Sequence, residues 1–593
     1  MRTGGTTSWL WCLCLAAQAC STSAADEGSE TPHVAPAASP PVDDLSTDQL
    51  SEDEPLEVAA EDDLPDGLET LAACSSEPAS FRVSPKSPVG GPVVGFGAQF
   101  NANLFDPAVG RFNQAKLGDL AAKLRELRPQ FVRIFFDSRA LRSPTLMTSF
   151  SRTVALAQSS GATINVTWWH GPYTGTQGTS SYGKQDMEQF ADVLKAEIVD
   201  RRHTAIKYVT VQNEPNRTKF NNHKKDLATV FKNLDASLKA RGIRSKVDLV
   251  FEITRGYKGT KSWFVDWLKV MGAEAGSVLD GYAFHIYWWN FMWDPVRDAR
   301  IKGYLDAMRS LPKSQRKPIY VTEFGTRGQP DANKSGLLWP GWLTKGCTAG
   351  KKGCRRIVDS TEGAVNNAFF QIMGARAGFR GFVYWDAYWT MYDKTEQHWS
   401  LLTKPSDGLR RRPTYFVQKL FSHVVQKGWV AVSVSNPGRQ HLRATAFRGN
   451  DQLTVIGANK AGCGTSFRYS GLPARRMYEI VWNDHGDGKI CSRGLRTPSG
   501  GALTVAMHPR SVVALTTRAP GLDAPACGAS GNQQKAPTCG DGECTEGETD
   551  ATCGKDCGCG AANACGSVAP FGCYCDATCA ETGDCCADAE VCR

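Results

Sequence analysis

The sequence lacks several features that mark common protein classes. After the N-terminus it has no run of 18 apolar residues, so nothing there is expected to span a membrane. It also has no compact stripe of Lys and Arg with interleaved aromatic residues, which argues against nucleic-acid binding. Residues 21–80 contain no Lys or Arg and are dense in Asp, Glu, Ala, Ser and Pro. Such a segment repels itself and has too little apolar mass to fold, so we expect residues 20–80 to form a disordered acidic stalk.

The rest of the chain has the composition of folded domains. A length of 593 residues is too great for one domain, and a 41% hydrophobic content can bury a large core. The net charge is +8 although the stalk is acidic, so the folded part must be basic. A basic surface favours the approach to acidic polysaccharide or to a cell surface.

The first 19 residues have the pattern of a signal peptide. Arg2 precedes the apolar run "SWLWCLCLAA", and small residues precede Cys20. The stretch "LAAQAC" resembles a bacterial lipoprotein box, which implies a lipid anchor on Cys20; plain cleavage after Ala19 is the alternative. In both cases we expect a secreted protein or an outer-surface lipoprotein of a bacterium, in a setting where disulfides persist.

Residues 81–427 alternate short apolar runs with longer helical patterns. This alternation is typical of a parallel α/β fold, and eight such units predict a (β/α)8 barrel. The eight runs are 93–100, 130–136, 162–170, 206–214, 247–254, 279–289, 318–325 and 381–389. In such a barrel the active site lies at the C-terminal ends of the strands.

Polar and aromatic residues gather at the ends of these runs. They are Arg133, His170, Asn213, Glu214, His285, Tyr287, Glu323 and Trp385. Pro215 ends the fourth run and turns the chain, which leaves Glu214 at the rim. Because the strand ends of a barrel converge on one mouth, we expect these side chains to form a single site.

Two motifs resemble glycoside hydrolase clan A. "VQNEPN" on the fourth run and "VTEFG" on the seventh are similar to its acid/base and nucleophile signatures, and "FVRIFF", "HIY" and "YWD" match further clan positions. The resemblance covers roughly residues 93–425, and families 5 and 39 both fit it. It implies that Glu323 is the nucleophile and Glu214 the acid. Retaining enzymes of this kind hold the two carboxyls about 5–5.5 Å apart.

The resemblance also implies roles for the neighbouring residues. Asn213 would bind the sugar 2-hydroxyl, and Arg133 and Tyr287 would keep Glu323 ionised and oriented. The remaining predicted substrate-binding residues are His170, His285 and Trp385. Taken alone, each histidine could be structural, Arg133 could belong to a structural ion pair, and Glu323 could be its partner. No cofactor or metal is expected.

The positions of the tryptophan residues indicate the class of substrate. Ten of the sixteen Trp residues lie near run ends: 168, 169, 288, 289, 293, 339, 342, 385, 389 and 399. Flat aromatic faces suit sugar rings, and Trp385 is the predicted floor of the central subsite. Trp263 and Trp267 are four residues apart on a predicted helix, so we expect them to lie in the core. We therefore expect an endo-acting β-glycanase with a polysaccharide substrate; a non-catalytic carbohydrate-binding or adhesion protein is the alternative.

Residues 428–520 alternate with a period of two and predict an antiparallel β-sandwich. Within it we expect a Cys463–Cys491 disulfide, and a Cys347–Cys354 disulfide should close a loop after the seventh strand. Cys74 and Cys527 then remain to pair with each other. A buttress for the barrel is the favoured role of this domain.

The C-terminal end is predicted to be a linker (521–538), a four-Cys module (539–557) and a small domain (558–593). Segments this small need cross-links to fold. The last eight cysteines resemble a somatomedin B domain, which implies a protein partner. The resemblance also implies four disulfides: Cys559–Cys575, Cys565–Cys592, Cys573–Cys586 and Cys579–Cys585.

Overall fold

The structure is a computed structural model of the chain. It describes residues 77–528 except 107–113, 170–182, 218, 255–260, 289–293, 327–342, 344–346, 348–351, 353, 389–398, 436, 440, 485 and 487. The signal peptide, nearly all of the stalk, the four-Cys module and the somatomedin B-like domain with its four disulfides lie outside the described residues.

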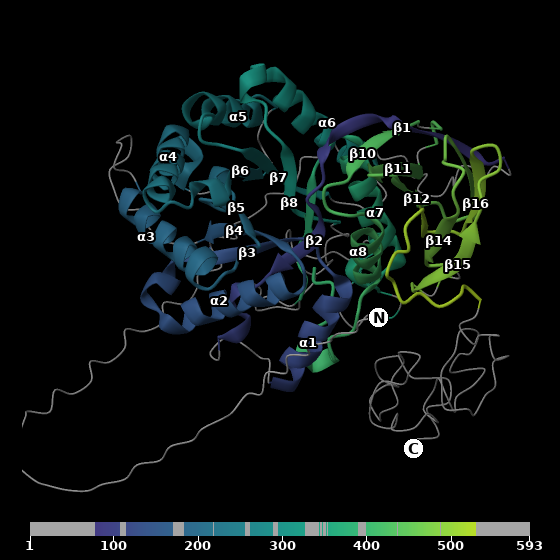
Figure 1. Ribbon diagram of the computed structural model, residues 1–593, viewed down its shortest axis with the longest axis horizontal. Coiled ribbons are helices and arrows are strands. Elements are labelled where there is room, and N and C mark those ends of the chain that lie inside the picture. The colour runs from purple at the N-terminus through teal and green to yellow at the C-terminus, as the bar shows by residue number, and fades with distance from the viewer. Residues whose placement is uncertain are drawn as a thin grey trace, which may run out of the picture. The chain divides into compact units, whose positions relative to one another are not determined.

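Eight parallel strands close into a barrel, which confirms the predicted fold class (Figure 1). The strands are β2 (Gly95–Phe100), β3 (Phe131–Asp137), β4 (Thr163–Trp169), β5 (Ile206–Thr210), β6 (Asp248–Thr254), β7 (Gly281–Trp288), β8 (Ile319–Thr326) and β9 (Gly381–Tyr384). Every residue of β3 is buried, because a barrel strand is covered on both faces.

Helices follow the strands and pack around the barrel (Figure 1). They are α1 (Gln114–Leu127), α2 (Pro144–Ser159), α3 (Lys184–Lys195), α4 (Lys224–Ala240), α5 (Lys261–Ala275), α6 (Asp294–Ser310), α7 (Thr361–Arg376) and α8 (Pro413–Val424). Local chemistry sets their starts: the Ser360 hydroxyl accepts from the amide of Gly363, and Ser143 with Pro144 begins α2. Among the described residues, no helix has the length and apolar character needed to cross a membrane.

The second domain is a β domain with nine linked strands. They are β1 (Ala79–Pro92), β10 (Val430–Val434), β11 (Leu442–Gly449), β12 (Gln452–Asn459), β13 (Thr465–Ser470), β14 (Met477–Trp482), β15 (Ile490–Arg496), β16 (Ala502–Met507) and β17 (Ser511–Thr516). Their order is β15-β14-β17-β12-β11-β10-β1-β13-β16. The paired strands are antiparallel except for β1 and β13, which run parallel.

The predicted start of the barrel at residue 81 is wrong, because β1 belongs to the β domain. Its first half pairs with β13 and its second half with β10, across two irregularities of register. Phe81 packs in the core of this domain, 4.8 Å from the ring of Phe467. The strand was missed because its prolines and glycines, "SPKSPVGGP", hide the alternation, and its partners lie hundreds of residues away.

The β domain packs on the barrel through α7 and α8. Apolar residues of β11, β12 and β14, including Phe447, Ile456 and Trp482, share one hydrophobic core with the barrel helices. Thr454 donates to the carbonyl of Val424 (2.9 Å), and the Arg376 guanidinium donates to the carbonyl of Ala444 (2.8 Å). These contacts support the flank of the barrel, as a buttress does.

One disulfide prediction is confirmed and two are wrong. Cys347 pairs with Cys354, as predicted. Cys491 pairs with Cys527, so the predicted pairs Cys463–Cys491 and Cys74–Cys527 do not form. The chain after the last strand returns beside β15, where the Cys527 amide donates to the carbonyl of Ser492 (2.8 Å). Cys463 is also disulfide-bonded, and since the other described cysteines are paired, its partner lies outside the described residues.

Candidate active site

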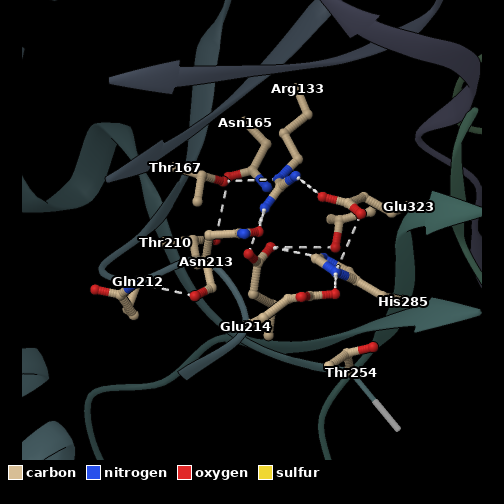
Figure 2. Close-up of polar contacts among 12 residues, drawn as sticks. Arg133, Asn165, Thr167, Thr210, Gln212, Asn213, Glu214, Thr254, His285 and Glu323 are labelled. Atoms are coloured by element: carbon tan, nitrogen blue, oxygen red, sulfur yellow. Dashed lines mark hydrogen bonds and ion pairs between the residues drawn. The ribbon is translucent and has the colours of Figure 1, made fainter. Parts of the chain in front are cut away.

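Polar residues from four barrel strands and their C-terminal loops meet at one point (Figure 2). Arg133 comes from β3, Asn213 and Glu214 follow β5, His285 lies on β7 and Glu323 on β8. The predicted residues therefore gather as expected from the fold. His170 lies outside the described residues.

Glu214 and Glu323 both approach the same ring nitrogen of His285. One oxygen of each glutamate and one nitrogen of His285 all lie within 4.8 Å of one another. The His285 Nδ1 is 2.8 Å from Glu214 Oε1 and 3.3 Å from Glu323 Oε2. This spacing suits two carboxyls that act on the same glycosidic bond by double displacement, for which about 5–5.5 Å is usual.

Glu323 is held by donors on both of its oxygens. Arg133 Nη1 donates to Oε1 at 2.5 Å, and the Tyr287 hydroxyl donates to Oε2 at 2.8 Å. Only 5% of the residue is exposed. Two charge-assisted hydrogen bonds favour an ionised carboxylate in a single orientation.

Glu214 is less enclosed and has an unusual backbone. β5 ends at Thr210, so Glu214 lies in the following loop and not on the strand as predicted. Its φ is +41°, in the left-handed region, next to Pro215, which disfavours the right-handed helical conformation at the preceding residue. Asn216 anchors the loop to β6 by exchanging hydrogen bonds with the backbone of Thr254. Such strained backbone is common where a side chain must be aimed.

Asn213 is oriented by the same arginine that holds Glu323. Arg133 Nη2 donates to Asn213 Oδ1 at 2.7 Å, and the Asn213 amide donates to the carbonyl of Trp168 at 3.2 Å. Within the described part of the chain, the Asn213 Nδ2 group makes no hydrogen bond. It is therefore a donor available to a ligand.

The structure adds a carboxylate that the sequence analysis missed. Glu252 on β6 is fully buried and accepts hydrogen bonds from Arg133 and, at 3.2 Å, from the hydroxyl of Thr322. The His285 Nε2 lies 3.5 Å from Glu252 Oε2, as an ion pair without hydrogen-bond geometry. The signal was a lone acid inside the apolar run "VDLVFEIT", since a buried charge requires a partner.

The charges of this cluster shift one another's protonation. Burial alone would raise the pKa of Glu252, but Arg133 and His285 outweigh it and lower this pKa below its usual value. Burial alone would lower the pKa of His285, but Glu323, Glu252 and the contact with Glu214 raise it to about 10. His285 is therefore a cation at neutral pH, and Glu252 is an anion.

The pKa of Glu323 is raised, whereas that of Glu252 is lowered. Burial raises the pKa of the Glu323 carboxyl, and Glu214 and Glu252 act in the same direction against the charges of His285 and Arg133. Two cations thus face three carboxyls. Because neighbouring carboxylates repel each other, the Glu214–Glu323 pair retains one proton more readily than isolated glutamates do.

Geometry alone would allow Glu214, His285 and Glu323 to hold a metal ion. The Arg133 cation, which contacts Glu323, disfavours a second positive charge at this point. Arg133 and Tyr287 also donate to the two oxygens of Glu323, as they would to a carboxylate that acts without a metal ion. We therefore interpret the set as an acid–base site.

Aromatic rings line part of the mouth. Trp385 is half-buried, with its ring 5.8 Å from that of Phe135, and Phe135 stacks on Trp169 at 5.2 Å. The ring of Trp399 lies 5.2 Å from that of Tyr287. These half-buried tryptophans are positioned to contact a sugar.

Two other tryptophans predicted to line the cleft are core residues. Trp168 packs against Phe136 and Phe190, and Trp288 stacks on Phe370 at 4.8 Å; both are about 1% exposed. Successive residues of a strand point to opposite sides, so Trp168 faces the helices while Trp169 faces Phe135. Trp267 is core, as predicted. Trp289, 293, 339, 342 and 389 lie outside the described residues, and so does the side chain of Trp263.

Comparison with known proteins agrees with this geometry. Residues 175–337 match the family model "Glycosyl hydrolase catalytic core", a span that contains both Glu214 and Glu323 but less than half of the chain. No curated protein matches the chain.

Several solved structures share the fold. The catalytic domain of the GH30 xylanase C from Talaromyces cellulolyticus matches with a TM-score of 0.52 and 14% identity, over 74% of this chain and 100% of that one. A GH30 endoxylanase from Clostridium papyrosolvens C71 matches with a TM-score of 0.50 and 13% identity over the same shares. AbfB, a family 51 α-L-arabinofuranosidase from Bifidobacterium longum, matches with 0.51 and 12%, over 74% and 99%.

At these identities the structural matches establish the fold alone. The catalytic-core match, which contains both glutamates of the site, supports glycosidase activity.

Proposed function

We propose that the protein is an exported, retaining endo-β-glycanase that hydrolyses β-glycosidic bonds within a polysaccharide. The observation that carries the proposal is the pair Glu214 and Glu323, close together and in different surroundings. Glu323 accepts from Arg133 and Tyr287, whereas Glu214 has 16% of its side chain exposed and contacts His285. Different surroundings separate the proton donor from the nucleophile.

In the first step, Glu323 attacks the anomeric carbon while the bond to the leaving oxygen breaks. Glu214 gives its proton to that oxygen, and a covalent glycosyl–enzyme ester remains on Glu323. We assign the negative charge to Glu323 because it has two strong donors, and the shared proton to Glu214. The assignment leaves the cluster of Arg133, His285, Glu252, Glu323 and protonated Glu214 with no net charge.

In the second step, water attacks the same carbon and releases Glu323. Esterification has removed the negative charge from Glu323, so the repulsion that kept Glu214 protonated is gone. The His285 cation at 2.8 Å then favours an ionised Glu214, which takes a proton from the water. The sugar leaves with the anomeric configuration of the substrate.

Three further groups serve this chemistry. Asn213 offers its free amide N–H to a sugar hydroxyl, with its carbonyl oxygen held by Arg133. Glu252 is a positioning residue: its charge compensates those of Arg133 and His285 and so keeps both cations in place. Trp169, Trp385 and Trp399 provide flat surfaces for sugar rings, which supports a polymeric substrate.

Export is supported by the signal-like N-terminus and by the disulfides Cys347–Cys354 and Cys491–Cys527. Such bonds persist in oxidising compartments and are rare in the cytosol. The choice between families 5 and 39, the lipid on Cys20 and the protein partner of the somatomedin B-like domain stay predictions. Mass spectrometry of the mature N-terminus tests the lipid.

The proposal is tested by incubating the purified protein with a panel of β-glycans and following the fresh product by NMR. We expect the cleaved sugar to keep the β configuration before it mutarotates. An α product would contradict double displacement. Binding without cleavage of any glycan would favour the non-catalytic carbohydrate-binding alternative.

A further inference from the structure

A cavity lies among the loops that follow β9 and precede α7 and α8. Its volume is about 480 Å³, within the range of roughly 300–1,000 Å³ that is usual for small-molecule sites. Its lining residues are Arg356, Asp359, Thr403, Lys404, Asp407, Arg410, Arg411, Arg412 and Pro413. Five cationic side chains face two carboxylates, so the wall carries a net charge of 5 − 2 = +3.

The cavity is lined by residues that directly precede α7 and α8, and the helices of such a barrel begin at the end where the active site lies. Residues 399–412 follow β9 and fold back on themselves: Leu402 pairs with Arg411, and the Arg412 amide donates to the carbonyl of Leu401. This segment begins at Trp399, whose ring contacts Tyr287. The Arg412 guanidinium donates to the carbonyl of Ser400 at 3.1 Å, so the cavity wall and the aromatic lining of the active site share one hairpin.

Some of the cations are already neutralised and others are not. Arg412 is buried and pairs with Asp359 at 2.9 Å, and Arg411 pairs with Glu126. Lys404 has only a distant contact with Asp407, at 3.9 Å. The exposed side chain of Arg410 makes no ion pair or hydrogen bond within the described part of the chain. Lys404 and Arg410 therefore leave positive charge available in the cavity.

We propose that this cavity is a subsite for a carboxylate-bearing sugar of the substrate chain, which rests on the proposed glycanase function. A guanidinium forms paired hydrogen bonds with a planar carboxylate, and a lysine adds a point charge beside it. A polysaccharide that passes Trp399 at the mouth can extend along the same hairpin and place an acidic residue or branch in the cavity. The subsite would make the enzyme selective for acidic glycans.

The test compares one acidic β-glycan with its carboxyl-reduced, neutral counterpart. The variant K404Q/R410Q removes the two available charges without touching the catalytic cluster. We expect kcat/KM on the acidic glycan to fall about tenfold, the size of one or two lost charge-assisted hydrogen bonds, and that on the neutral glycan to stay the same. The control variant K207Q/K246Q removes two exposed lysines near the N-terminal ends of β5 and β6 and should leave both rates unchanged.

Equal losses on both glycans, or no loss on either, would overturn the subsite. Calorimetry with an acidic oligosaccharide tests binding separately, so that failure of the subsite is distinguished from failure of the glycanase proposal. Binding that K404Q/R410Q abolishes, in a protein that cleaves nothing, would keep the cavity and refute the glycanase. Inorganic phosphate or sulfate that competes at the same concentration as the oligosaccharide would show a general anion site and refute recognition of a sugar.

Discussion

The same strands carry neutral aromatic residues at one end of the barrel and charged residues at the other. At the N-terminal end, Phe131, Tyr208 and Tyr320 form an aromatic cluster with ring centroids 5.2–6.1 Å apart, together with small apolar residues. Two or three residues further along β3 and β8 lie Arg133 and Glu323. At the aromatic end burial raises the pKa of Tyr208 and of Tyr320, which keeps both phenols neutral.

At the catalytic end burial alone does not set the protonation state of the side chains. Arg133, His285 and Glu252 are fully buried but face partners of opposite sign, and these partners keep all three ionised. The difference teaches that depth alone does not decide protonation in this barrel. A buried group remains charged only where a counter-charge compensates for the loss of water.

The largest effect is expected from E323Q, which removes the proposed nucleophile at the charged end. Hydrolysis should fall roughly 10⁴-fold or more, because glutamine cannot form the glycosyl ester. Steady-state kinetics on the best glycan measures the loss. E274Q on α5, a glutamate that forms surface ion pairs with Lys225 and Lys232, is the matched control and should retain full activity. Near-normal activity of E323Q would remove Glu323 from the reaction.

E252Q tests whether the buried counter-charge matters for catalysis. We expect kcat to fall roughly 10²-fold, because Arg133 and His285 lose the anion that positions them. Without Glu252 the pKa of His285 should drop below about 10, so the alkaline limb of the pH–kcat profile should move to lower pH. A merely structural role would lower stability without moving that limb. E252D, which keeps the charge, should restore part of the activity and the alkaline limb.

The same cluster should make stability depend on pH. Because folding raises the pKa of His285 from 6.5 to about 10, its contribution is complete below pH 6.5 and is lost as the pH rises through 10. The free energy of unfolding of the wild type should therefore decline across this alkaline range. H285Q should lack that part of the decline, which denaturant titrations at several pH values measure. An identical alkaline decline in both proteins would contradict the cationic state of His285.

The smallest effect is expected at the aromatic end. Y320F removes the phenol hydroxyl that hydrogen-bonds with Tyr208. The free energy of unfolding should therefore fall by about 1 kcal/mol. Activity should not change, because no charge is lost. Thermal denaturation and the standard assay test this together. A large loss of kcat in Y320F would show that the two ends of the barrel are coupled.

Local patterns sufficed for much of the fold and of the site. Eight runs of β-branched and aromatic residues marked the barrel strands, and the polar residues at their ends identified Arg133, His285 and Glu323. The turn at Pro215 placed Glu214 at the rim, although β5 ends at Thr210 and the left-handed backbone of Glu214 carried no sequence signal of its own.

Local sequence patterns were enough to predict the elements and the side on which their polar ends meet, because periodicity and turn residues act over a few neighbours. The long-range pairs became visible in the folded chain alone: β1 between β10 and β13, Cys491 with Cys527, and Glu252 between Arg133 and His285. Each depends on segments far apart in the chain. A buried carboxylate, a cysteine or an irregular strand does not name its partner until packing brings the two together.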